Sequence, residues 1–394
     1  MDYLLSRHPI FKSKVEVAGY EIRSNAVGDK AVDASRATLS LLSGDGFSHI
    51  VGTHLCFVNL TRETLEDQSW QQIPRDKIVL AYFGDFAPSG DVAAHLKELM
   101  GGGLRVALSG HLNPESLAEV AAKAYALKLD VASIDPGELE KKFVELKNYN
   151  VPLLADRVDT YDDLEFCREL GFDLYQGRFI ARTATVAEKD IPVNRMAMMR
   201  IMSKLLDPNL VIPDLAKTIS LDAALSYKLL SYSNSAAVSL PRNVTSIDHA
   251  VRLIGLDRIR TWASVLLLST VEDKPRELMT IALVRGKMCE LLSKSVKNAQ
   301  TESYFSAGLL SVIDALLDAP MEKAVAGLPL VEDVKAALIH KSGSIGQALR
   351  CAIAYENADW EEVQFYGMAS GPIRDAYVES ITWARNLTNG LLQK

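Results

Sequence analysis

The sequence predicts a TIM-like βα barrel in the first half of the chain and an all-α domain in the second half. A chain of 394 residues is long enough for two or three compact units. Up to about residue 187, short β-type runs alternate with helical stretches, which is typical of βα units around a parallel sheet. The number of repeats favours a closed barrel, with an open doubly wound sheet as the alternative. The strand pattern then disappears, so we expect domains at 1–187 and 190–394.

The expected elements of the first half alternate in order along the chain. The expected strands are 15–22, 54–60, 77–83, 104–110, 129–134, 151–156 and 173–177. The expected helices between them are 29–42, 92–100, 114–126, 137–148 and 161–171. A polar connector near 183–192 then leads into the second half.

The second half shows apolar residues at helical spacing almost throughout. In 195–206, methionines and leucines recur every three or four residues, so we expect these methionines to be core residues. Ser246 is a suitable N-cap and Gly255 a suitable C-terminal cap for a helix over 247–254. Further helices are expected at 276–296, 303–317, 331–340, 344–356 and 373–392.

Composition and charge exclude several classes of protein. With 48% hydrophobic and 24% charged residues, the chain is an ordinary globular protein. No apolar run is long enough to cross a bilayer and no secretory pattern opens the sequence, so we expect a cytoplasmic protein. The net charge of −7 argues against nucleic acid and membrane surfaces as partners. The 4 cysteines are far apart, which favours free buried thiols.

Five segments of the first half together resemble the EAL domain of bacterial cyclic di-GMP signalling. They are RHPIF (7–11), GYEIR (19–23), FVNLTRETL (57–65), LLADRVDT (153–160) and LGFDLYQGRF (170–179). The resemblance implies a barrel whose active members hold two divalent metals at the carboxyl ends of the strands and hydrolyse a phosphodiester. Hard cations of this kind need carboxylate and carbonyl ligands.

Measured against that family, the site is incomplete. The matching positions are Glu21, Asn59, Asp135, Asp156 and Gln176. The positions where the family's charged residues are missing are Ala81, Ser109, Gly110 and Ser133, the last being read as a lost lysine. We therefore expect a degenerate barrel that is not an enzyme and holds no metal or other cofactor.

Two arginines could still contact phosphate groups. Arg157 stands among the remaining carboxylates, and Arg23 follows the family's signature glutamate. A receptor that binds cyclic di-GMP without cleaving it is therefore an alternative.

The segment 304–338 resembles the HDOD domain, a helical relative of the HD phosphohydrolases, and the resemblance extends over about 190–394. Where an HD enzyme carries its His-Asp pair, this chain has Ser311 and Val312. The only histidines of this half are His249 and His340, so we expect no metal site here.

The stretch 214–235 could form a helix-turn-helix, which leaves a DNA-binding regulator as a weak alternative. Lys217 and Lys228 are its only basic residues, and its leucines suit a core.

The order of the two resemblances predicts a signal-transduction protein that acts through protein contacts. The expected partners are signalling proteins, namely a kinase, a regulator or another EAL or GGDEF protein, and a homodimer is compatible with this function. Cyclic di-GMP is the lesser alternative as a ligand. An active metal-dependent phosphodiesterase is a further alternative.

Overall fold

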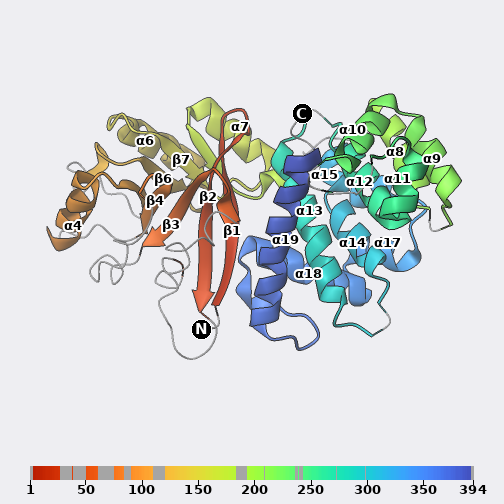
Figure 1. Cartoon of the computed structure of the whole chain (residues 1–394). Coiled ribbons are helices and arrows are strands. Elements are labelled where there is room, and N and C mark those ends of the chain that lie inside the picture. The colour runs from red at the N-terminus through yellow and green to blue at the C-terminus, as the bar shows by residue number, and fades with distance from the viewer. Residues whose placement is uncertain are drawn as a thin grey trace. The chain divides into compact units, whose positions relative to one another are not determined.

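The fold is seen in a computed structural model (Figure 1). It describes residues 3–26, 38, 50–60, 75–83, 90–109, 120–182, 193–207, 209–235, 238, 243–271, 273–297 and 299–391. Two expectations fall wholly or mostly elsewhere, namely the helix at 29–42 and the connector at 183–192, and of the helix expected at 114–126 only residues 120–126 are described.

The first half forms a closed barrel in the order β1 to β8. Its strands are β1 (Tyr3–Lys12), β2 (Val17–Ala26), β3 (Leu55–Leu60), β4 (Ile78–Phe83), β5 (Arg105–Ser109), β6 (Ala126–Asp130), β7 (Leu153–Asp156) and β8 (Leu174–Gln176). Strand β1 runs antiparallel to β2 and β8, and the other neighbouring pairs from β2 to β8 are parallel. The predicted closed barrel is confirmed, and the open sheet is excluded.

Small and large apolar side chains from successive strands fill the barrel. The packed cluster consists of Ile10, Phe57, Val79, Ala81, Ala107, Ala126 and Leu154. Alanines on three neighbouring strands leave room for the larger Ile10 and Phe57, as in other filled barrels. The interior is therefore a core, and polar side chains gather at the strand ends.

Two strands differ from expectation. Strand β1 was not expected, because RHPIF contains a proline and mixes polar with apolar residues. The strand expected at 129–134 is instead β6, which ends at Asp130 and is followed by the 3₁₀ turn η2 (Val131–Ser133). The helical spacing extends to Ala126, which hid the start of this short strand.

The helices described around the barrel are α4 (Gly90–Gly101), α6 (Pro136–Lys147) and α7 (Tyr161–Leu170). Helix α7 begins with a capping box between Thr160 and Asp163 and ends at Gly171, whose φ of 99° is left-handed. A 3₁₀ turn, η3 (Phe179–Ala181), follows β8.

The second half is helical, as expected. Its described helices are α8 (Val193–Leu205), α9 (Ile212–Ser220), α10 (Ala223–Ser233), α11 (Ile247–Ile254), α12 (Leu256–Leu268), α13 (Arg276–Ser293), α14 (Thr301–Leu310), α15 (Ile313–Leu317), α16 (Met321–Ala326), α17 (Glu332–His340), α18 (Gly343–Asn357) and α19 (Ser370–Leu391), with η4 (Trp360–Glu362) between the last two. Ser246 caps α11 by accepting from the backbone N–H of His249, and Gly255 is its C-cap. Met198 and Met202 are buried core residues.

Backbone contacts divide the chain into two units. Unit 1 contains residues 1–180, 354–364 and 368–374, and unit 2 contains 181–353, 365–367 and 375–394. The predicted ranges 1–187 and 190–394 stay a prediction, because their junction lies outside the described residues.

Cys56, Cys167, Cys289 and Cys351 are all free and buried. Within the part of the chain that the structure describes, no helix is long and apolar enough to cross a bilayer.

Helices α13 and α14 pack closely in unit 2 where two glycines meet. A Cβ added to Gly308 would lie 2.5 Å from backbone atoms of Arg285 and Gly286. A Cβ added to Gly286 would lie 3.2 Å from the ring of Phe305. Only glycine allows this approach of one helix backbone to another.

Candidate functional site

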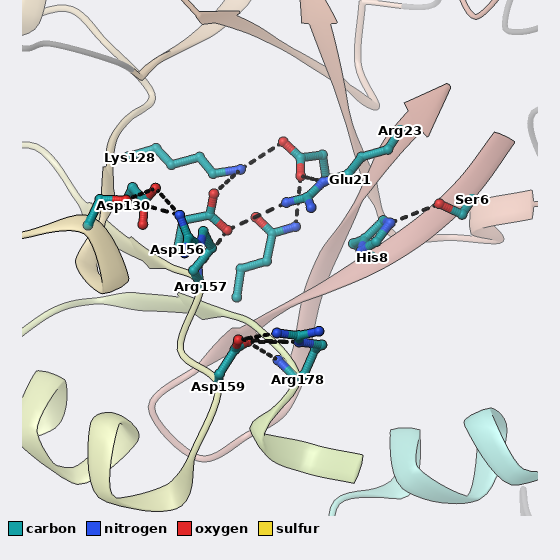
Figure 2. Close-up of polar contacts among 12 residues, drawn as sticks. Ser6, His8, Glu21, Arg23, Lys128, Asp130, Asp156, Arg157, Asp159 and Arg178 are labelled. Carbon is teal, nitrogen blue, oxygen red and sulfur yellow. Dashed lines mark hydrogen bonds and ion pairs between the residues drawn. The ribbon is translucent and has the colours of Figure 1, made fainter. Parts of the chain in front are cut away.

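The carboxyl ends of the barrel strands bring several polar side chains together (Figure 2). We call this group the carboxyl-end cluster, and it consists of Glu21, Arg23, Lys128, Asp130, Asp156, Arg157 and Gln176. In βα barrels, active sites are built at this end of the strands. Residues from β2, β6, β7 and β8 meet here although they are far apart in the sequence.

Lys128 is the centre of the cluster. Its Nζ lies 2.8 Å from Oε1 of Glu21 and 3.1 Å from Oδ2 of Asp156. Arg23 joins the same two carboxylates, with Nε 2.8 Å from Oε2 of Glu21 and Nη2 3.6 Å from Oδ1 of Asp156. Gln176 donates from Nε2 to Oε2 of Glu21 at 3.0 Å. Two carboxylates thus share two cations.

Glu21 is ionised in this setting. Its side chain is only 3% exposed, and this burial alone would raise its pKa. The charges of Lys128 and Arg23 outweigh burial and hold the pKa of Glu21 well below its ordinary range. Burial likewise works against the charge of Arg23, but Glu21 and Asp156 raise its pKa above the usual value.

His8 lies beside the cluster as a neutral imidazole. Burial, with Arg23 and Lys128 nearby, lowers the pKa of His8 to about 3 although Glu21 acts in the opposite direction. Its Nε2 and the Ser6 hydroxyl are hydrogen-bonded at 2.8 Å.

The position of Lys128 corrects the assignment of β6. The family pattern of a lysine two residues before an aspartate falls on Lys128 and Asp130, not on Ser133 and Asp135. Asp135 is instead the N-cap of α6, where its Oδ1 accepts from the backbone N–H of Gly137 at 3.0 Å. The lysine read as lost is therefore present.

Arg157 pairs with Asp130, the last residue of β6. Its Nη1 lies 2.8 Å from Oδ2 of Asp130 and donates to the Ser133 hydroxyl at 3.0 Å. Arg178, which the sequence analysis did not single out, pairs with Asp159 at 2.6 Å (Figure 2). The two cations that pair with Glu21 and Asp156 are Arg23 and Lys128.

The positions expected to lack ligands divide into three cases. Ala81 is 2% exposed inside the barrel, in register with Asn59 on β3. Ser109 is buried and donates to the carbonyl oxygen of Tyr82 at 3.2 Å. Gly110 lies outside the described residues.

Asn59 lines a hollow that could not be expected from the sequence. This hollow has a volume of about 430 Å³, lies within unit 1 and is also lined by Arg23, Asn357, Asp359 and Trp360. Residues more than 300 positions apart in the sequence meet here, and no local motif signals such an arrangement.

A divalent metal site does not fit the side chains described. Among them, no three carboxylate, histidine or cysteine side chains form a group that could hold a metal ion. Glu21 and Asp156 are each joined to both Lys128 and Arg23, so positive charge already faces these oxygens. No metal-dependent step is derived for this chain.

Ser311 and Val312, which stand where an HD enzyme carries its His-Asp pair, are buried in the helical half. Val312 is fully buried, and Ser311 donates to the carbonyl oxygen of Gly308 while accepting from Nη1 of Arg285 at 3.2 Å. The stretch 214–235 contributes α9 and α10, and its residues Leu225 and Leu229 are core residues.

Comparison with known proteins shows which family and which relatives the chain is similar to. Residues 191–340 match the HDOD domain family. The chain is 27% identical over 403 residues to the cyclic di-GMP phosphodiesterase CdgJ of Vibrio cholerae, covering 97% of this chain and 92% of the relative. It is 26% identical over 408 residues to the uncharacterized protein YuxH of Bacillus subtilis, covering 98% of this chain and 99% of that protein.

Solved structures match just under half of this chain. The PaMucR phosphodiesterase in complex with cyclic di-GMP matches 46% of this chain and 96% of its own, at 16% identity and a TM-score of 0.39. A standalone EAL protein of Vibrio cholerae, bound to cyclic di-GMP, matches 46% of this chain and 92% of its own, at 15% identity and a TM-score of 0.36.

The chain thus combines a closed βα barrel with a helical half in which residues 191–340 match the HDOD domain family, in the order that the resemblance implied. Two functional expectations are corrected. The expectations of a protein that is not an enzyme, and of signalling by protein contacts alone, are wrong, because a relative aligned over nearly the whole chain is a phosphodiesterase by name. That name also favours cyclic di-GMP as a ligand, which we had treated as the lesser alternative.

Proposed function

We propose that this protein is a cyclic di-GMP phosphodiesterase and that its barrel holds the substrate. The observation that carries the proposal is the relationship to the cyclic di-GMP phosphodiesterase of Vibrio cholerae, which includes both domains in the same chain. The location of the carboxyl-end cluster supports it, because barrel enzymes place their reacting groups at that end.

The cluster offers the charges that a phosphodiester substrate needs. Cyclic di-GMP carries two phosphodiester groups, and each is an anion at neutral pH. Arg23, Lys128 and Arg157 are the cations that would face such groups, and arginine suits phosphate oxygens because it donates two parallel hydrogen bonds.

Two acceptors of the cluster are left for a ligand or for the attacking water. Oδ1 of Asp130 and Oε1 of Gln176 are buried and have no hydrogen-bond partner among the described side chains. Hydrolysis needs a water oxygen to attack phosphorus, a P–O bond to break, and a base to take the proton of that water. Asp130 is the carboxylate that we assign as this base.

The hollow beside Asn59 would hold one of the two guanine bases. Trp360 offers an aromatic face, and Asp359 offers a carboxylate that can accept from the N–H groups of a guanine edge. Arg23 lines this hollow and also belongs to the cluster, so a base and its phosphate could be bound side by side.

The test is turnover of cyclic di-GMP by the full chain, with the linear dinucleotide product separated by chromatography. Reactions contain magnesium, manganese or a chelator, so that any metal requirement is measured. We expect turnover by the wild-type protein, and a loss of at least about tenfold in Asp130→Asn if this carboxylate is the base. Lys147→Gln removes an exposed cation that pairs with Asp173 at 3.4 Å and serves as the matched control with unchanged turnover.

Absence of product under all three conditions contradicts the proposal, even if cyclic di-GMP binds. Equal turnover by wild-type protein and Asp130→Asn would leave the proposed activity standing but show that Asp130 is not the base.

A further inference from the structure

Unit 2 contains a second pocket, unrelated to the barrel. It has a volume of about 550 Å³ and lies among α10, α12, α13, α14 and α19. Four aromatic residues line it, namely Tyr232, Trp262, Phe305 and Trp383, and we call it the aromatic pocket. Its volume is in the range of small-molecule sites, which is roughly 300–1,000 Å³. Ser311 and Val312, at the HD position, are not among its lining residues.

The four aromatic rings form two edge-to-face pairs. The ring centroids of Tyr232 and Trp262 are 4.6 Å apart at an interplanar angle of 83°. Those of Phe305 and Trp383 are 5.8 Å apart at 82°. Edge-to-face pairs of this kind hold the rings in fixed orientations.

Cations lie against the same rings. The guanidinium of Arg258 is 5.5 Å from the centroid of Trp262, and Nζ of Lys287 is 5.6 Å from that of Trp383. Lys287 is also paired with Glu290 at 2.7 Å. Arg258 is exposed and, in the part of the chain that the structure describes, forms no salt bridge. It is therefore the cation available to an anion that enters the pocket.

Two buried polar atoms of the lining point to a polar ligand group. Ser264 is 2% exposed, yet its hydroxyl has no hydrogen-bond partner among the described residues. The buried Nε of Arg260 also has none, although Nη1 of the same side chain lies 3.7 Å from Asp257. Buried polar groups are normally hydrogen-bonded, so unpartnered ones in a pocket wall suit a bound molecule.

We propose that the aromatic pocket binds a small aromatic anion, whose ring packs on Trp262 and Trp383 and whose negative group is bound by Arg258. This inference goes beyond the proposed phosphodiesterase function. It rests on unit 2 alone, so either can fail without the other.

The test is calorimetric titration of the full chain with three probes that separate ring from charge. They are naphthalene-2-sulfonate, the uncharged 2-naphthalenemethanol, and inorganic phosphate. We expect the sulfonate to bind, the alcohol to bind about tenfold more weakly, and phosphate not to bind, because both the ring and the charge contribute. The indole N–H NMR signals of Trp383 and Trp360 are assigned from their loss in Trp383→Phe and Trp360→Phe. The Trp383 signal should shift when the sulfonate is added, and the Trp360 signal should not, because Trp360 does not line the pocket.

Paired variants locate the anion. Arg258→Gln should lower sulfonate affinity about tenfold and leave the alcohol unaffected, since only the charge-assisted contact is removed. Arg252→Gln is the matched control, because Arg252 is an exposed arginine on α11 that pairs with Asp248 at 2.8 Å and does not line the pocket. No sulfonate binding, equal binding of sulfonate and alcohol, or equal losses in the two variants would each overturn the proposal.

Discussion

Nζ of Lys128 lies 2.8 Å from Oε1 of Glu21, so two residues 107 positions apart form an ion pair at the carboxyl end of the barrel. The side chains are 11% and 3% exposed, respectively. Such a pair contributes little relative to an apolar pair of the same size, but loss of one partner leaves a buried charge without its counter-charge.

Replacement of Lys128 should therefore destabilise the protein strongly. We expect Lys128→Gln to lower the free energy of unfolding by about 2–4 kcal/mol, with Arg23 and Gln176 limiting the loss because they remain bound to Glu21. Lys147→Gln, which breaks an exposed pair, should cost less than about 1 kcal/mol. Urea denaturation followed by circular dichroism measures both, and similar losses would show that the Lys128 pair has no special role in stability.

Stability should fall below neutral pH because of His8. Its pKa is lowered from 6.5 to about 3 in the folded protein. As the pH falls below 6.5, His8 becomes protonated in the unfolded chain but stays neutral in the folded protein. The stability that the neutral His8 contributes is therefore complete above pH 6.5 and is lost towards pH 3. A histidine with this shift in pKa lowers the free energy of unfolding by about 1 kcal/mol between about pH 7.5 and about pH 5.5.

The comparison of wild-type protein with His8→Gln isolates that effect from the other histidines. The pH dependence of the urea midpoint should be shallower in the variant. The imidazole NMR signal of His8 is identified as the one missing from the spectrum of His8→Gln. Its chemical shift should stay constant down to about pH 5, because the pKa of His8 is lowered. A signal that titrates near pH 6.5 would show that His8 is accessible to water.

Gly177, next to Gln176, allows a close backbone approach. A Cβ at this position would lie 1.9 Å from the carbonyl oxygen of Val158, a distance that no rearrangement of side chains relieves. Gly177→Ala should therefore displace the end of β8 and lower the apparent melting temperature by several degrees, since a loss of about 1 kcal/mol corresponds to roughly 2–4 °C in a chain of this size. Gly101→Ala is the control, because nothing lies within 4 Å of its added Cβ, and its melting temperature should be unchanged.

Cleavage of the chain between residues 183 and 192 should leave the barrel attached to part of the C-terminal region. Residues 354–364 and 368–374 belong to the same unit as the barrel strands. The hydroxyl of Tyr355 accepts from the backbone N–H of Leu5 at 3.2 Å, and the guanidinium of Arg374 lies 5.0 Å from the ring of Tyr3. After limited proteolysis, the two fragments should elute together in size-exclusion chromatography. Separate elution without denaturant would contradict this assignment of residues 354–374.

Much of the fold could be predicted from the sequence because apolar spacing reflects burial, although β1 was missed. The alternation of strands and helices predicted the closed barrel, and Ser246 and Gly255 marked the ends of α11 correctly. The prediction was less accurate at β6, where helical spacing continued to Ala126 and the strand was expected to start three residues too late. That shift hid Lys128, the centre of the carboxyl-end cluster.

The ion pairs of the cluster depend on distances across the barrel, which spacing does not encode. The partner of Arg157 is Asp130, whose position depends on where β6 ends. Asp359 and Trp360 could not be assigned to the barrel side at all, because the pattern around them is that of the helical half.

Gly286 and Gly308 also bear on what the aromatic pocket can admit. Lys287 and Leu309, which follow these glycines directly in the sequence, are both lining residues, so one wall of the pocket is anchored where two helix backbones touch. Widening the pocket on that side would separate α13 from α14 and open a void between them, which close-packed interiors resist. The close contact between α13 and α14 therefore sets an upper limit on the width of a molecule that this pocket can admit.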